Sequence, residues 1–163
     1  MIPLCANRGQ KISSLGVVST YSLVYTTPGA YIGGCLSPDG SIHMIPYNAN
    51  KGQKINPDGS VSTYSLLYTN PNGAYQGGCL APDGSIHFIP CDATVGQKVS
   101  LSGVVSTYSL VYTTTYAYSG GCLSPDGSIH FIPSQTNKGQ KVSIVTGIPF
   151  SLGICLSPFL NKF

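Results

Sequence analysis

The chain carries little charge and lacks two residue types altogether. Charged residues make up 8% of its 163 residues, and it contains neither glutamate nor tryptophan. All five acidic residues are therefore aspartates, which narrows the choice of catalytic acids and bases. The formal net charge of +3 is too small for the dense lysine and arginine footprint that nucleic acid requires. We therefore expect no nucleic-acid partner.

Long apolar runs are missing too. No run approaches the roughly 20 residues of a transmembrane helix. The opening residues, Met-Ile-Pro-Leu-Cys, show neither the charged nor the apolar part of a secretory signal. These absences predict a protein with no membrane partner, located in the cytoplasm.

The abundant features are turn residues and internal repeats. The segment 33–43 returns almost verbatim at 77–87 and 120–130, and Gly-Gln-Lys recurs four times at spacings of 43 or 44 residues. A period of this size, built from short β-like runs and Asp-Gly turns, is typical of propeller blades. We expect one all-β domain over residues 1–163. Its repeats cover approximately 1–30 (partial), 31–74, 75–117, 118–149 and 150–163 (partial).

The second complete copy predicts one four-stranded antiparallel blade. Residues 75–80 and 85–90 form strands joined by a Pro-Asp-Gly turn. Gln97 opens a third strand, and a β-branched and aromatic run over 104–113 forms the fourth. Hairpin connections between consecutive strands make the blade a meander.

The ends of the chain are offset from the repeat. Residues 1–3 match the end of a second strand, and residues 150–158 resemble a first strand. This offset predicts closure by complementation of N- and C-terminal strands, within the chain or between subunits, which removes exposed sheet edges. The shortened last repeat favours a homo-oligomer. The alternative fold is a β-trefoil, which has three whole repeats.

The cysteines follow the same repeat. Four occupy one blade position, where we expect small buried apolar residues rather than disulfides: Cys35, Cys79, Cys122 and Cys155. Cys5 and Cys91 fall in variable loops and are predicted to be free thiols.

The stretch Leu36–His43, followed by a second Pro-Asp-Gly turn at 57–59, resembles the repeats of NHL, SMP-30-like and WD-type β-propellers. The resemblance covers almost the whole chain and implies a fold rather than an activity. The Trp-Asp dipeptide of the WD class is absent. The acidic metal ligands of SMP-30-like enzymes have no evident counterpart in a chain without glutamate.

The charges suggest two different faces. Four aspartates fall in turns after first and third strands, which should lie on one face of the molecule. The lysines and tyrosines fall near the loops after second and fourth strands, which should lie on the opposite face. A basic face with tyrosines would hold an anionic or sugar-like ligand through charge-assisted bonds and ring stacking. The predicted ligand-binding residues are Lys11, Lys54, Lys98, Lys141, Tyr31, Tyr75 and Tyr118. The alternative is that the charges outline solvated loops and the tyrosines pack between blades.

Three histidines could in principle make a zinc site: His43, His87 and His130. Each occupies a second strand of a different blade, and neighbouring blades diverge away from the axis. We therefore expect a repeated hydrogen bond, to the Asp-Gly turn or an adjacent blade, with no metal and no cofactor.

Serines recur with the repeat, whereas a catalytic residue normally breaks such symmetry. The polar residues that break it are Tyr47, Cys91, Asp92 and Tyr116. No paired carboxylates accompany them, so the sequence predicts no enzyme. It predicts a binding module for a small ligand, glycan or protein. The alternatives are a structural repeat protein that assembles into a multi-subunit ring, and a propeller lyase or hydrolase.

Overall fold

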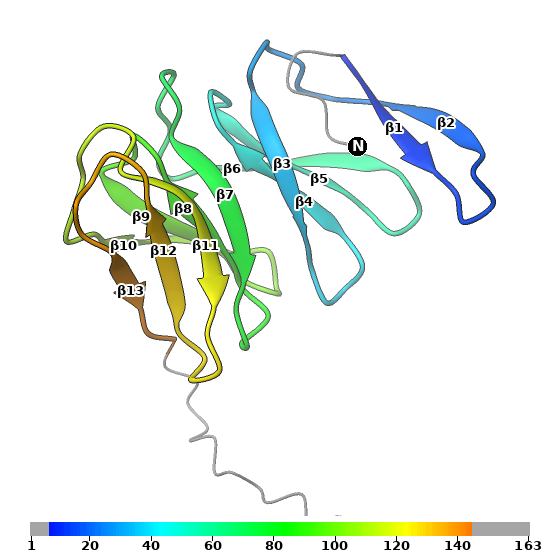
Figure 1. The fold of residues 1–163 in the computed structure, drawn as a ribbon. Helices are drawn as coiled ribbons and strands as arrows, with labels where there is room; N and C mark the ends of the chain where they lie inside the picture. The colour runs from blue at the N-terminus through cyan, green and yellow to red at the C-terminus, as the bar shows by residue number, and fades with distance from the viewer. Residues whose placement is uncertain (1–6, 145–163) are drawn as a thin grey trace, which may run out of the picture.

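A computed structural model describes residues 7–144, which form thirteen strands and no helix (Figure 1). The first sheet has β1 (Arg8–Ile12) and β2 (Val18–Ser22). The second has β3 (Tyr31–Leu36), β4 (Ile42–Pro46), β5 (Lys51–Ile55) and β6 (Val61–Ser65). The third has β7 (Tyr75–Leu80), β8 (Ile86–Pro90), β9 (Val95–Val99) and β10 (Val105–Ser109). The fourth has β11 (Tyr118–Leu123), β12 (Ile129–Pro133) and β13 (Gln140–Val142).

All strand pairs are antiparallel and join strands that are consecutive in the chain, so each sheet is a meander. The prediction of four-stranded antiparallel blades is confirmed by the second and third sheets. The terminal strands predicted at residues 1–3 and 150–158 lie outside the described residues. Closure of the ring therefore stays a prediction.

The Pro-Asp-Gly turns have a common local cause. In the third sheet the backbone N–H and the hydroxyl of Ser85 both donate to Asp83 Oδ1, at 2.9 and 2.5 Å. Gly84 takes a φ of +79°, which side chains rarely adopt, and its N–H donates to the carbonyl of Ala81 at 3.0 Å. The carboxylate thus holds the hairpin between β7 and β8 closed.

The sheets stack like an opened fan, with β3, β7 and β11 side by side (Figure 1). Glycines in these strands allow the close approach. A Cβ atom on Gly78 would lie 2.4 Å from Ile45 Cδ1, and one on Gly121 would lie 2.7 Å from Ile89 Cδ1. The second strands of the second and third sheets, β4 and β8, therefore each pack an isoleucine against a glycine of the next sheet.

A glutamine links each sheet to the one before it. Gln97 Oε1 accepts the backbone N–H groups of Leu67 and Tyr68, both at 2.9 Å, where the chain leaves β6. Gln53 and Gln140 likewise each accept two backbone N–H groups from the sheet before their own, just after β2 and β10. These bonds take N–H groups out of the sheet ladder. The fourth strand predicted over 104–113 accordingly ends at 109.

Cysteine positions follow the stacking only in part. The four described cysteines, Cys35, Cys79, Cys91 and Cys122, are all free thiols. Cys79 is buried as predicted, Cys35 is half-buried, and Cys122, in the last described sheet, is exposed. Cys5 and Cys155 lie outside the described residues.

Residues 7–144 contain no helix that is both long enough and apolar enough to cross a bilayer.

Candidate functional site

The lysines of the third strands lie at the same end of the sheets as the aspartate turns. Lys98 pairs across the sheet with His87, next to the Asp83 turn. Its Nζ lies 3.8 Å from Asp83 Oδ2, and Lys141 Nζ lies 3.1 Å from Asp126 Oδ2. The prediction that these lysines form a basic face opposite an acidic one is therefore wrong. Two adjacent strands run antiparallel, so the end of a third strand returns to the turn that follows the first.

The predicted tyrosines lie at the opposite end of the sheets, and they are buried. Tyr31, Tyr75 and Tyr118 expose 2%, 0% and 0% of their surface. The hydroxyl groups of Tyr31 and Tyr75 donate to the carbonyls of Lys51 and Val95, at 2.7 and 3.1 Å. These tyrosines thus pack in the core, as the alternative interpretation expected.

The structure therefore does not bring the seven predicted ligand-binding residues together. Lys98 and Lys141 face aspartates, Lys54 is half-buried, and the exposed Lys11 lines a hollow between the first two sheets. A ligand-binding role for any of these side chains stays a prediction from the sequence.

Two of the three histidines, His43 and His87, make the repeated hydrogen bond that was expected, with a different partner, whereas His130 is exposed. His43 Nδ1 lies 3.2 Å from the hydroxyl of Tyr64, and His87 Nδ1 lies 3.2 Å from that of Tyr108. Both partners come from the fourth strand of the same sheet rather than from a turn or another blade. No group of three histidine, cysteine or aspartate side chains within residues 7–144 is arranged to hold a metal ion.

Buried His87 makes stability depend on pH. Burial, reinforced by the charge of Lys98, lowers the pKa of His87 to about 4, compared with about 6.5 in an unfolded chain. Between these values the unfolded state binds more protons, so the free energy of unfolding should fall as pH drops from 6.5 to 4. We expect His87→Asn to flatten this fall in urea titrations at several pH values. An unaltered slope in His87→Asn would contradict the assignment.

A polar hollow of about 740 Å³ opens at the end of the sheets away from the aspartate turns. It lies among the loops that follow β4, β6, β8 and β10. Ten residues line it: Tyr47, Asn48, Asn70, Pro71, Asn72, Asp92, Thr94, Thr113, Thr115 and Tyr116. Three of the four repeat-breaking residues that the sequence singled out are among them.

The backbone around the hollow is the same in each repeat. The N–H groups of Asn48, Asp92 and Gln135 donate to the carbonyls of residues 29, 73 and 116, at 3.1, 3.0 and 3.0 Å. These are equivalent positions of three successive copies. The side chains at these positions differ from copy to copy, although the frame that holds them does not. The shared backbone structure therefore does not explain why position 92, in the second of these three copies, is an aspartate.

Asp92 is the centre of the hydrogen bonding at this site. Its Oδ1 accepts the backbone N–H of Tyr116 at 2.6 Å, and its carbonyl accepts Asn70 Nδ2 at 3.1 Å. Asp92 is the one aspartate of the five outside a Pro-Asp-Gly turn. These bonds join the loops after β6 and β10 to the loop that carries Asp92.

Tyr116 takes a backbone conformation that normally requires glycine. Its φ is +51°, and the equivalent residues Gly29 and Gly73 have φ values of +69° and +107°. A residue with a Cβ atom is destabilised by about 1–2 kcal/mol in this region. The tyrosine side chain nonetheless exposes 42% of its surface at the hollow. A strained backbone conformation at an exposed aromatic residue is typical of functional positions.

Tyr47 and Cys91 complete the surroundings of Asp92. Burial raises the pKa of Tyr47, and electrostatic interaction with the acidic groups of Cys91, Tyr116 and Asp92 raises it further. Burial, reinforced by Asp92, also raises the pKa of Cys91 to about 11. The thiol of Cys91 is fully buried and donates to Gln76 Oε1 at 3.4 Å, so it is protonated at neutral pH and poorly suited to be a nucleophile.

No family model matches the chain, and no curated protein matches it. Solved structures do. The selenomethionine-substituted virginiamycin B lyase from Staphylococcus aureus is 26% identical, with a TM-score of 0.69 over 86% of this chain and 50% of that one. A catalytically inactive histidine-to-alanine variant of that lyase, with quinupristin, is 23% identical, with a TM-score of 0.67 over 86% and 50%. A calcium-binding protein, regucalcin, from Agrobacterium tumefaciens is 14% identical, with a TM-score of 0.52 over 75% and 43%.

These likenesses confirm the β-propeller-like repeat fold and exclude the β-trefoil alternative. The chain spans about half the length of the propellers it matches. The prediction that the protein is not an enzyme is contradicted, because structures that it resembles are named enzymes. That prediction relied on the missing glutamate and on repeat symmetry, and neither feature prevents a propeller from carrying an active site.

Proposed function

We propose that the hollow around Asp92 binds a small, hydroxyl-rich molecule of the sugar class. The observation that carries the proposal is the convergence of Tyr47, Asp92 and Tyr116 on one polar hollow. These residues break a repeat that is otherwise almost exact, and one of them does so in a strained backbone conformation.

The lining chemistry favours hydroxyl groups over anions. A carboxylate accepts hydrogen bonds from hydroxyl groups, and asparagine amides both donate and accept. Tyrosine rings add flat apolar surfaces against which a sugar ring packs. None of the described residues that line the hollow is basic, so an anionic ligand would meet the charge of Asp92 without compensation.

A glycan array followed by calorimetry on the best binder tests this proposal. We expect Asp92→Asn to weaken binding about 10- to 100-fold, because hydrogen bonds to a charged group contribute about 1.5–3 kcal/mol. Asparagine already stands at the equivalent position 48, so the loop should keep its fold. The matched control is Asp58→Asn, which changes an exposed aspartate in a turn of the opposite face.

The variant Tyr116→Gly separates binding from stability. It restores the residue found at positions 29 and 73, so the protein should unfold at no lower urea concentration than the parent. Binding should fall because the exposed ring is lost. A silent array, or equal affinity in Asp92→Asn and the parent, would overturn the proposal.

A second candidate is a lyase activity, favoured by the likeness to the virginiamycin B lyases. One of those structures holds quinupristin. Chromatography and mass spectrometry of quinupristin after incubation with this protein test the candidate directly. Conversion that is lost in Asp92→Asn would support it, and recovery of unchanged quinupristin would exclude that substrate.

A further inference from the structure

The least exposed of the five aspartates has no neighbouring cation. Asp92 is half-buried, whereas the four aspartates in turns are exposed. Lysine Nζ atoms lie 3.8 Å from Asp83 Oδ2 and 3.1 Å from Asp126 Oδ2, but no lysine, arginine or histidine among residues 7–144 forms an ion pair with Asp92. A charge that is withdrawn from water is normally paired, because its burial without compensation costs free energy. The described part of the protein leaves the charge of Asp92 uncompensated.

The carboxylate of Asp92 also keeps one oxygen for a further hydrogen bond. The backbone N–H of Tyr116 donates to Oδ1 at 2.6 Å, and the thiol sulfur of Cys91 lies 3.9 Å from the same oxygen. No residue in the described range donates to Oδ2. Each carboxylate oxygen can accept hydrogen bonds, and Asp92 lines the hollow, so Oδ2 is available to a donor that enters it.

Two tyrosine rings stand beside this carboxylate. Tyr47 and Tyr116 line the same hollow from the loops after β4 and β10. The face of a tyrosine ring attracts a cation, because its π electrons give it a negative potential. The carboxylate and the rings therefore favour the same kind of group, one that carries a positive charge.

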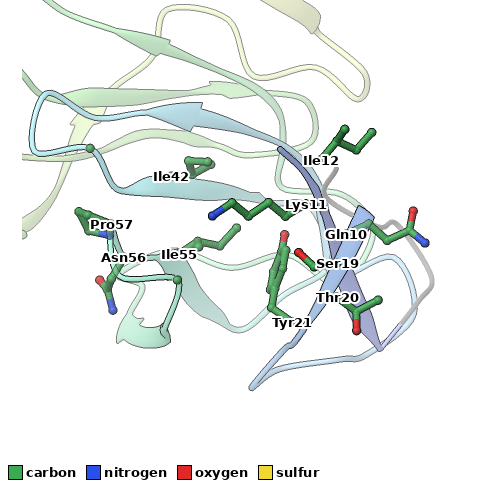
Figure 2. Close-up of a pocket in the computed structure, with 12 residues that line it drawn as sticks. Gln10, Lys11, Ile12, Ser19, Thr20, Tyr21, Ile42, Ile55, Asn56 and Pro57 are labelled. Carbon is green, nitrogen blue, oxygen red and sulfur yellow. The ribbon is translucent and has the colours of Figure 1, made fainter. Parts of the chain in front are cut away.

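The hollow between the first two sheets, of about 640 Å³, has the opposite character (Figure 2). In Figure 2 the side chain of Lys11 points from β1 toward the second sheet. The described lining of that hollow contains Lys11 and no aspartate. A cation would be repelled by Lys11 there, whereas the residues that line the hollow around Asp92 include no basic side chain. The charge of the two linings thus directs a cation to Asp92.

The lining suits an organic cation better than a metal ion. Calcium takes about six to eight oxygen ligands, commonly from several carboxylates. Asp92 is the only acidic side chain among the residues that line its hollow, and no group of three potential ligands in residues 7–144 is arranged to hold a metal. A protonated amine requires less, because its N–H groups can bond a single carboxylate. A volume of about 740 Å³ is also large enough for a small organic molecule.

We propose that the ligand bound around Asp92 carries a protonated amine and is therefore an amino sugar. This inference rests on the proposed function, which supplies the hydroxyl-rich part of the ligand. The ammonium group donates to Oδ2 of Asp92 and lies against the exposed ring of Tyr116. The asparagine and threonine side chains of the surrounding loops bond the hydroxyl groups.

Calorimetry with matched pairs of sugars tests the charge. The probes are glucosamine, galactosamine and mannosamine, each compared with the parent sugar that carries a hydroxyl group in place of the amine. At mildly acidic pH the amines are protonated. At least one amino sugar should then bind about tenfold more tightly than its parent sugar, because charge-assisted hydrogen bonds are about twice as strong as neutral ones. Added salt should reduce this preference.

Three variants assign the preference to the hollow. Asp92→Asn should weaken binding of the amino sugar about tenfold more than binding of its parent sugar. Asn72→Asp adds an exposed carboxylate to the lining and should strengthen binding of the amino sugar alone, by about two- to fivefold. Lys11→Gln changes the other hollow and should affect neither sugar.

The possible results separate this inference from the proposed function. Equal affinity for every amino sugar and its parent, lost in Asp92→Asn, would overturn the inference and leave the sugar site intact. Ethanolamine that binds as tightly as any amino sugar would support the cation and contradict the sugar class. Displacement of the amino sugar by calcium chloride would overturn the assignment to an organic cation. No binding of any probe, by protein with a normal urea transition, would overturn both proposals.

Discussion

Replacing Gly96 with alanine is expected to lower the free energy of unfolding by about 3 kcal/mol. The added Cβ atom would lie 2.1 Å from Cε2 and 2.3 Å from Cζ of Tyr108, which pairs with Gly96 across β9 and β10. The ring is not free to move away, because the Tyr108 hydroxyl group bonds to buried His87. The methyl group would therefore separate the two strands or break that hydrogen bond.

Urea denaturation measures the effect, and Gly120→Ala is the matched control. Gly120 has no positive φ, and a Cβ atom added to it would have no neighbouring atom within 4 Å. This control should change the free energy of unfolding by less than about 1 kcal/mol. Gly52 packs against Tyr64 in the same way, with 2.1 Å to Cε2, so Gly52→Ala should reproduce the loss in the second sheet. A loss no larger in Gly96→Ala than in Gly120→Ala would contradict this account.

The variant Gln97→Leu is expected to lower the free energy of unfolding by about 2–4 kcal/mol. Leucine has nearly the same volume, so the change removes hydrogen bonds without leaving a large cavity. The N–H groups of Leu67 and Tyr68 would lose their shared acceptor at the boundary of two sheets. Each unsatisfied buried N–H group costs about 1–3 kcal/mol, and both groups here are only partly shielded from water.

The exposed control Gln135→Leu should change the free energy of unfolding by less than about 0.5 kcal/mol. Hydrogen exchange gives a second readout, since the amides of residues 67 and 68 should lose protection first in Gln97→Leu. If the two variants were equally stable, the glutamine would not be the link between sheets that its geometry indicates.

The fold was largely predictable because a repeated sequence repeats its environment. Each Pro-Asp-Gly turn, alternating strand and Gly-Gln-Lys tripeptide occurs several times, so one copy supports the interpretation of another. The prediction of charged faces was wrong for a reason that strand order explains. Lys98 follows the loop after β8 by only a few residues, so it was assigned to the face of that loop. Antiparallel pairing of β8 with β9 instead brings its side chain beside Asp83.

The candidate site was only partly predictable. Departures from the repeat identified Tyr47, Cys91, Asp92 and Tyr116, but they could not show that the loops of successive blades converge. Nor could they show that Tyr116 has a positive φ. Its alignment with Gly29 and Gly73 did indicate this, because glycine is the residue that most readily adopts a positive φ.

The sequence by itself determined the local structure of this protein: its strands, its turns and the period of its blades. These depend on neighbours within a few residues, which the chain order specifies directly. Only the tertiary structure decided which residues meet between blades, including the contacts of Asp92 and the glutamine links between sheets. Those contacts join residues about 20–30 positions apart, and their geometry depends on how whole sheets stack.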